Sequence, residues 1–201
     1  MDKMEKMEQL ADTIKKCKKC ELGYTRLNAV VGDGSLQSEI LFIGEAPGSN
    51  EDKQGKPFVG RAGKILDELL ASINLKRDDI YIANILKCRP PNNRNPNKNE
   101  IEKCTDYLDK QLDLLNPSIL VPLGNFSYQY IFEKFGLPLE KISKVHGRIF
   151  KKQTLDGLLY IVPMYHPAVA TYNPNKIDIL KHDFKTLQTI MDSISIETVN
   201  R

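Results

Sequence analysis

Four cysteines are the residues whose type and spacing most directly indicate chemistry in this sequence. Cys17 and Cys20 form a C-K-K-C pair, and Cys88 and Cys104 lie far downstream with fifteen residues between them. Four thiolates complete a zinc site or an iron–sulfur cluster equally well, so the spacing predicts a metal centre without identifying the metal. The alternative is a redox-active or incidental C-K-K-C pair with Cys104 buried in a helix. A metal centre would tie the N-terminal segment to the loop that contains Cys88, which indicates a structural role.

The glycine-rich loop at residues 43–63, IGEAPGSNEDKQGKPFVGRAG, is the second candidate for a functional element. A glycine-rich turn between a strand and a helix is typical of phosphate sites. The P-loop pattern G-x-x-x-x-G-K-[ST] is not matched, because Phe58 replaces its first glycine and Ile65 replaces its Ser/Thr. Glu45 would also repel an anion. The loop is therefore not predicted to bind phosphate.

Three further residues suggest a pocket for a flat ring. Asn84 interrupts an otherwise apolar strand, His166 follows another apolar strand and precedes a proline, and Phe58 lies in the glycine-rich loop. Each of them alone is compatible with an ordinary structural role. Together at one edge of a sheet, an amide, an imidazole and a phenyl ring suit a planar heterocycle. The rings would stack on its face, and the polar groups would form hydrogen bonds with its edge.

The elements that must position these residues alternate between strand and helix. Short apolar runs predict strands at 39–44, 79–86, 118–124 and 158–165, and helical periodicity predicts helices at 61–73, 98–115, 125–135 and 176–194. Asn97 and Glu100 form a predicted capping box at the start of the second helix. This alternation predicts an α/β fold with a parallel sheet covered on both faces. Ligands of such sheets bind at the carboxyl ends of the strands, where the unusual residues gather.

The composition is that of one globular domain spanning residues 1–201. The chain is 41% hydrophobic and 27% charged, and no run approaches the roughly 18 apolar residues of a membrane helix. The N-terminus lacks the apolar centre of a secretory signal, so we expect a cytoplasmic protein with no membrane contact. Segments 87–99 and 141–155 are basic, contain no acidic residue, and are interpreted as loops that either face phosphates or are simply solvated. The first of them holds Lys87, Arg89, Arg94 and Lys98.

Taken together, these motifs resemble those of a known family. The stretches GEAPGSNEDKQGKPFVGRAG, NILKCRPPNNRNP and HPA, with the four cysteines in this order, resemble the family 4 uracil-DNA glycosylases of bacteria and archaea. The resemblance extends from Cys17 to about residue 190. It implies the three-layer α/β/α sandwich of the uracil-DNA glycosylase superfamily, with a central four-stranded parallel sheet. It also implies a structural [4Fe–4S] cluster ligated by Cys17, Cys20, Cys88 and Cys104.

The same resemblance implies a uracil pocket and a role for each residue in it. Phe58 would stack on the base, Asn84 would read its edge, and His166 would contact the O2 side. The GEAPG segment would line the pocket through Gly44, Glu45, Ala46 and Gly48. The activity implied is flipping of deoxyuridine out of DNA and hydrolysis of its N-glycosidic bond, which releases free uracil and leaves an abasic site. Glu45 and His166 are the predicted catalytic residues.

One departure concerns the acid that activates water. The best-known branch of the superfamily has an aspartate where this chain has Ala46, and Glu45, Glu51 and Asp52 are the only local carboxylates. Glu45 is expected to have an important role, which could be with water, with sugar charge or at the C5 edge of the base.

The basic segments would contact the DNA backbone of a substrate bound by a monomer. The predicted contacts are Arg89, Arg94, Lys98 and Arg148. Two alternatives stay open: a related glycosylase of altered specificity, and a four-cysteine DNA-binding module without catalysis. The presence of both Asn84 and His166 argues against a simple binding module, which needs neither.

Overall fold

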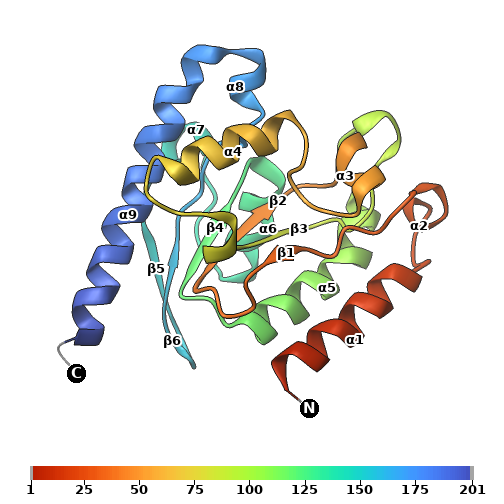
Figure 1. Cartoon of the computed structure of the whole chain (residues 1–201), viewed down its shortest axis with the longest axis horizontal. Helices are drawn as coiled ribbons and strands as arrows, with labels where there is room; N and C mark the ends of the chain where they lie inside the picture. The colour runs from red at the N-terminus through yellow and green to blue at the C-terminus, as the bar shows by residue number, and fades with distance from the viewer. Residues whose placement is uncertain (1, 200–201) are drawn as a thin grey trace.

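A six-stranded sheet forms the centre of the protein, which a computed structural model describes over residues 2–199 (Figure 1). The strand order is β1-β3-β2-β4-β6-β5, and the four inner strands β3, β2, β4 and β6 run parallel. The strands are β1 (Asp33–Gly34), β2 (Ile40–Gly44), β3 (Tyr81–Asn84), β4 (Ile119–Pro122), β5 (Phe150–Thr154) and β6 (Gly157–Ile161). The inner strands are the four that the apolar runs predict.

The sheet is wider than the predicted four-stranded one, because an antiparallel strand is added at each edge. β1 pairs with β3 and β5 pairs with β6, both antiparallel. β1 is only two residues long, which is too short to show a periodicity. β5 has the sequence FKKQT, whose lysines are typical of an exposed edge strand. The interpretation of 141–155 as a loop was therefore wrong, since this segment forms a short helix and β5.

Successive residues of the inner strands point into two separate cores. In β2, Leu41 and Ile43 belong to the core that includes buried residues of α1 (Lys3–Lys16) and α5 (Lys98–Leu115). Ile40 and Phe42 belong to the other core, with α4 (Arg61–Ala71) and α9 (Ile177–Val199). Because both faces of the sheet are covered, the molecule has the three predicted layers (Figure 1).

Four helices begin within one residue of the predicted segments, α1 is a further long helix that was not predicted, and the α5 capping box is confirmed. The Asn97 side chain accepts a hydrogen bond from Glu100 N (2.9 Å), and Glu100 Oε2 accepts one from Asn97 N (2.9 Å). Besides the helices already named, the chain forms α2 (Leu22–Thr25), α3 (Ser49–Gln54), α6 (Asn125–Lys134), α7 (Ile142–Val145) and α8 (Val169–Tyr172), with 3-10 turns at Arg77–Asp79, Pro91–Asn93 and Pro174–Lys176. Within the described part of the chain, no helix has the length and apolar character needed to cross a bilayer.

Candidate active site

The carboxyl ends of β2 and β3 are level with each other, and this register creates the site. Gly44, the last residue of β2, is directly opposite Asn84, the last residue of β3. A Cβ atom on Gly44 would lie 2.2 Å from Asn84 Oδ1 and 2.9 Å from Cε2 of Phe58. The missing side chain at Gly44 therefore lets the Asn84 amide and the Phe58 ring meet at this edge of the sheet.

His166 completes this group from the other side of the sheet edge. It follows the parallel bridge between Leu123 and Met164, which extends the pairing of β4 and β6. Its imidazole is stacked against the Phe58 ring, with centroids 5.3 Å apart and planes inclined by 22°. The structure thus brings together the three residues that the sequence predicts for a base pocket. Phe58, which lies on a loop that looks exposed from its sequence, is buried.

The His166 imidazole is neutral and its hydrogen can be assigned. Burial lowers its pKa to about 4, although the nearby Glu51 carboxylate opposes this shift. Nδ1 lies 3.2 Å from the backbone N of Ala168 and accepts a hydrogen bond from that N–H group. A neutral imidazole whose Nδ1 is an acceptor carries its hydrogen on Nε2. The side chain is therefore a hydrogen-bond donor at neutral pH.

The remaining predicted pocket residues lie in the turn that follows β2. The carbonyl groups of Gly44 and Glu45 accept hydrogen bonds from Ile85 N and Leu86 N (3.0 Å each), so this backbone continues the pairing with β3. Burial raises the pKa of the Glu45 carboxyl group. Ala46 is half-buried, and Gly48 is the N-cap of α3.

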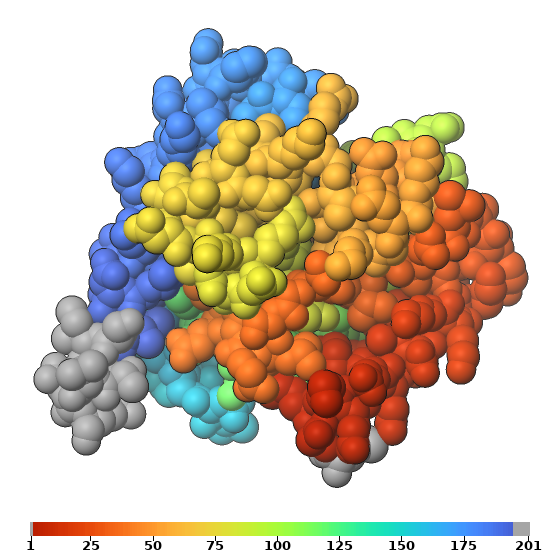
Figure 2. All heavy atoms as spheres, in the orientation of Figure 1, coloured from red at the N-terminus to blue at the C-terminus, as the bar shows by residue number. Residues whose placement is uncertain are grey.

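Glu51 is a residue of this site to which the sequence analysis assigned no role. Its Oε1 atom accepts hydrogen bonds from Val59 N (2.9 Å) and Gly60 N (2.8 Å). Gly60 is the N-cap of α4, so these two bonds fix the backbone that enters the helix and place a carboxylate near its N-terminus. Figure 2 shows α3 and α4 next to each other on the surface. No local pattern in the sequence indicates these bonds, because Glu51 is eight and nine residues from its partners.

The four cysteines line one cavity, together with Arg26 and Lys87. All four are free thiols; Cys88 and Cys104 are buried, and the other two are half-buried. Hydrogen-bond donors point at the sulfur atoms: Arg26 Nη1 lies 2.9 Å from Cys88 Sγ, and Lys87 N lies 3.2 Å from Cys104 Sγ. Such donors stabilise metal-bound thiolates. In the described residues, no group of three metal-ligating side chains is close enough to hold a single ion.

Lys87 does not belong to the basic surface where the sequence analysis placed it. Its side chain is fully buried, and Nζ donates to the carbonyl oxygen of Asn84 (2.8 Å) and to Oε1 of Gln111 (2.6 Å). It therefore cannot contact DNA. Because its backbone N–H binds Cys104, this one residue connects the cysteine cavity to the strand end that bears Asn84.

The four predicted DNA contacts differ in their surroundings. Arg94 forms two hydrogen bonds with Glu100 (2.6 and 2.9 Å), and the Arg94 guanidinium holds the pKa of that carboxyl group below its usual value. Lys98 is exposed and lies 3.8 Å from Glu102. Arg89 donates to Asn93 Oδ1 (2.8 Å), and Arg148 is exposed. Arg94 is thus already paired with a carboxylate, whereas Arg148 is exposed.

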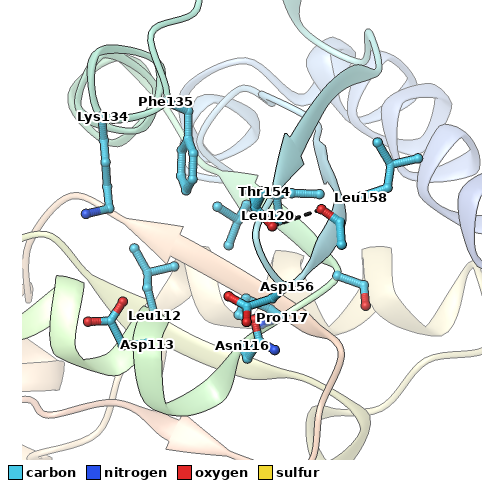
Figure 3. Close-up of a pocket in the computed structure, with 13 residues that line it drawn as sticks. Leu112, Asp113, Asn116, Pro117, Leu120, Lys134, Phe135, Thr154, Asp156 and Leu158 are labelled. Atoms are coloured by element: carbon cyan, nitrogen blue, oxygen red, sulfur yellow. Dashed lines mark hydrogen bonds between the residues drawn. The ribbon is translucent and has the colours of Figure 1, made fainter.

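A cavity of about 460 Å³ lies at the other end of the strands, away from Gly44 and Asn84 (Figure 3). It is lined by Asn116 and Pro117, which precede β4, and by residues 154 and 156–159 of the β5–β6 hairpin. These are the amino ends of β4 and β6, so this cavity is separate from the residues around Gly44.

Comparison with known proteins agrees with this geometry. The family model described as the uracil DNA glycosylase superfamily matches residues 31–190. A type-4 uracil-DNA glycosylase of Sulfurisphaera tokodaii is 47% identical over 191 residues, which cover 94% of this chain and 86% of that protein. One of Archaeoglobus fulgidus is 46% identical, covering 92% of both chains, and one of Thermotoga maritima is 40% identical, covering 81% of this chain and 82% of that protein. The chain belongs to the type-4 uracil-DNA glycosylases, as its motifs predict.

The first prediction concerns the empty space at Gly44. Gly44→Ala would force the Asn84 amide and the Phe58 ring apart, and a misplacement of about 1 Å in a site of this kind costs about 10²-fold in rate. We expect kcat/KM for a uracil-containing oligonucleotide to fall by that order. Gly157→Ala is the control, because it is strained at φ +132 but meets no atom within 4 Å. It should lower the melting temperature without lowering kcat/KM. A Gly44→Ala enzyme of wild-type activity would contradict this prediction.

The second prediction concerns pH. The folded His166 has a pKa of about 4, whereas an unfolded histidine titrates near pH 6.5. Between these values the unfolded chain binds the extra proton, so stability falls as the pH is lowered through this interval and is unaffected by this group above it. The pH profile of kcat/KM should show no inflection from His166 near 6.5. An inflection there that disappears in His166→Gln would show that the imidazole is not held neutral.

Proposed function

We propose that this protein flips deoxyuridine out of DNA and hydrolyses its N-glycosidic bond, releasing uracil and leaving an abasic site. The observation that carries the proposal is the convergence of the Phe58 ring, the Asn84 amide and the His166 imidazole around Gly44. The names of the relatives, type-4 uracil-DNA glycosylases, support the same activity.

The ring arrangement leaves a place for the base. With centroids 5.3 Å apart, Phe58 and His166 are offset, so the imidazole covers only part of the phenyl face. A uracil ring stacked on the rest of that face would lie beside the imidazole, with its O2 edge toward Nε2–H. As the glycosidic bond breaks, negative charge grows on the uracil, and one well-placed donor to it stabilises the transition state by about 3 kcal/mol.

The Asn84 amide accounts for the choice of base. Its oxygen can accept from N3–H of uracil and its NH₂ group can donate to O4, whereas cytosine presents the reverse pattern. The amide is buried, and Lys87 Nζ binds the backbone carbonyl of Asn84, which fixes the strand end from which the amide projects. A buried polar group that would be left unpaired discriminates strongly between such substrates.

Glu45 is the carboxylate that we assign to the sugar side of the pocket. The sugar becomes oxocarbenium-like as the bond breaks, and a carboxylate can stabilise that charge or orient the attacking water. Ala46 cannot do either. Arg89, Lys98 and Arg148 are proposed to bind the phosphates, which would make the affinity for DNA depend on salt; Arg94 would have to leave Glu100 to do so.

We further propose that Cys17, Cys20, Cys88 and Cys104 ligate a [4Fe–4S] cluster. Four free thiols around one cavity, with hydrogen-bond donors on three of the sulfurs, fit that group. When bound, it supplies a covalent tie between the N-terminal segment and the loop after β3. We propose a monomeric, cytoplasmic enzyme made of one domain over 1–201, of which residues 1, 200 and 201 lie outside the described part.

Activity is tested with a single-uracil oligonucleotide, incubated with the protein and then treated with alkali. Strand scission at the uracil is expected, with none in the same strand carrying cytosine or thymine. A protein that binds this DNA but produces no alkali-labile site, even with its metal centre reconstituted, would instead be a DNA-binding module without catalysis.

The third prediction concerns specificity. Asn84→Asp replaces the NH₂ donor by an acceptor or a protonated oxygen, so rejection of cytosine should weaken relative to wild type. The ratio of kcat/KM for uracil and cytosine oligonucleotides measures this. Asn93→Asp is the control, because Asn93 lies on the exposed turn after Cys88. An unchanged ratio in Asn84→Asp would show that Asn84 is only a core amide.

The fourth prediction concerns the metal centre. The protein purified without oxygen should be brown, absorb broadly near 400 nm and contain about four iron atoms per chain. Cys104→Ser should lose iron and unfold at a lower temperature, because the tie between α1 and α5 is weakened. A colourless wild-type protein containing zinc would overturn the iron–sulfur assignment, although the four cysteines would still be the metal ligands.

A further inference from the structure

The backbone of Phe58 has a conformation that its residue type disfavours. Its φ angle is +52°, in the left-handed region that bulky residues rarely adopt. The side chain is nevertheless buried and stacked on His166. Residues are held in such conformations only when their surroundings over-determine them, and this occurs mainly at functional sites. Something outside the glycine-rich loop must therefore hold Phe58.

Arg77 makes the contacts that hold it. This residue begins the 3-10 turn before β3, nineteen positions after Phe58. Its Nη2 donates to the carbonyl oxygen of Phe58 (2.5 Å) and, at 3.4 Å, to that of Gly63, while Nη1 donates to the carbonyl oxygen of Pro57 (3.1 Å). Nε donates to Oδ1 of Asp67 (2.6 Å), which fixes the orientation of the guanidinium.

Gly63 provides the space that this arrangement needs. A Cβ atom on Gly63 would lie 1.8 Å from the carbonyl oxygen of Phe58 and 3.2 Å from Arg77 Nη2. The Phe58 carbonyl is therefore pressed against the first turn of α4, beside the guanidinium. With the carbonyl in this place and a φ angle of +52°, the phenyl ring stacks on His166.

We propose that Arg77 is a positioning residue for uracil recognition, acting through the backbone of Phe58 to hold the stacking ring against His166. The planar guanidinium binds two successive carbonyl groups and a carboxylate through three separate nitrogen atoms in a fixed fork, whereas a lysine has a single nitrogen and no such span. Without these bonds the Phe58 backbone relaxes to an ordinary conformation and its ring leaves the base site. This inference rests on the proposed function and deepens it.

The experiment uses the full-length holoprotein with Arg77→Met and Arg77→Lys, and Asp67→Asn as the matched control. Asp67→Asn removes the charge of the ion pair but keeps an Oδ1 acceptor for Nε, so the guanidinium keeps its orientation and its bonds to the carbonyl groups. Both Arg77 variants should lose about tenfold in kcat/KM on a uracil oligonucleotide, the loss expected when one base–aromatic contact is given up. Inhibition by free uracil should weaken by a similar factor. Asp67→Asn should stay within about twofold of wild type.

A readout that does not depend on catalysis separates this inference from the proposed function. The chain has three histidines, so the imidazole NMR signals of His166 can be assigned by substitution. These signals carry the ring-current shift of the stacked Phe58, which should be lost in Arg77→Met and kept in Asp67→Asn. If wild type shows no excision but the shift behaves as stated, the proposed function fails and Arg77 still positions Phe58.

The opposite outcomes overturn the inference. It is wrong if Arg77→Met keeps wild-type uracil inhibition and the His166 shift while only its melting temperature falls. It is also wrong if Asp67→Asn loses as much activity as Arg77→Met, since the ion pair alone would then matter. Should Arg77→Met fail to fold, Arg77→Lys keeps the charge and most of the packing and decides between the same outcomes.

Discussion

The site depends on the pairing of Gly44 with Asn84. Parallel strands whose carboxyl ends are level put two residues side by side, and here one of them has no side chain. The space left by the missing side chain is occupied by the amide of Asn84, at the end of the neighbouring strand, and by the ring of Phe58, from the glycine-rich loop. With any other residue at Gly44, the Asn84 amide and the Phe58 ring would be displaced together.

Two charged side chains bind the backbone of the glycine-rich loop around Phe58. Glu51 binds the backbone N–H groups of Val59 and Gly60, and Arg77 binds the carbonyl groups of Pro57 and Phe58. An anion thus satisfies the donors after Phe58 and a cation satisfies the acceptors at and before it. The loop contains five glycines, but the backbone of residues 57–60 is bound by these two side chains. The phenyl ring of Phe58 is therefore held in one orientation.

The sequence was informative where periodicity and topology decide the structure. Apolar runs locate the inner strands, and the rule that parallel strands align their carboxyl ends brings Asn84, His166 and the glycine-rich loop to one edge. What escaped prediction depends on partners distant along the chain. The conformation of Phe58 is set by Arg77, the burial of Lys87 is set by Asn84 and Gln111, and the edge strand β5 exists because β6 offers it hydrogen bonds. Because segments 87–99 and 141–155 are basic and contain no acidic residue, Lys87 and β5 were both interpreted as parts of exposed loops.

The burial of Lys87 joins two parts of the molecule that would otherwise be described separately. Its backbone N–H binds the sulfur of Cys104 and its ammonium group binds the carbonyl oxygen of Asn84. Both contacts are made by one residue, so a substitution at Lys87 would disturb the cysteine cavity and the strand end of Asn84 together.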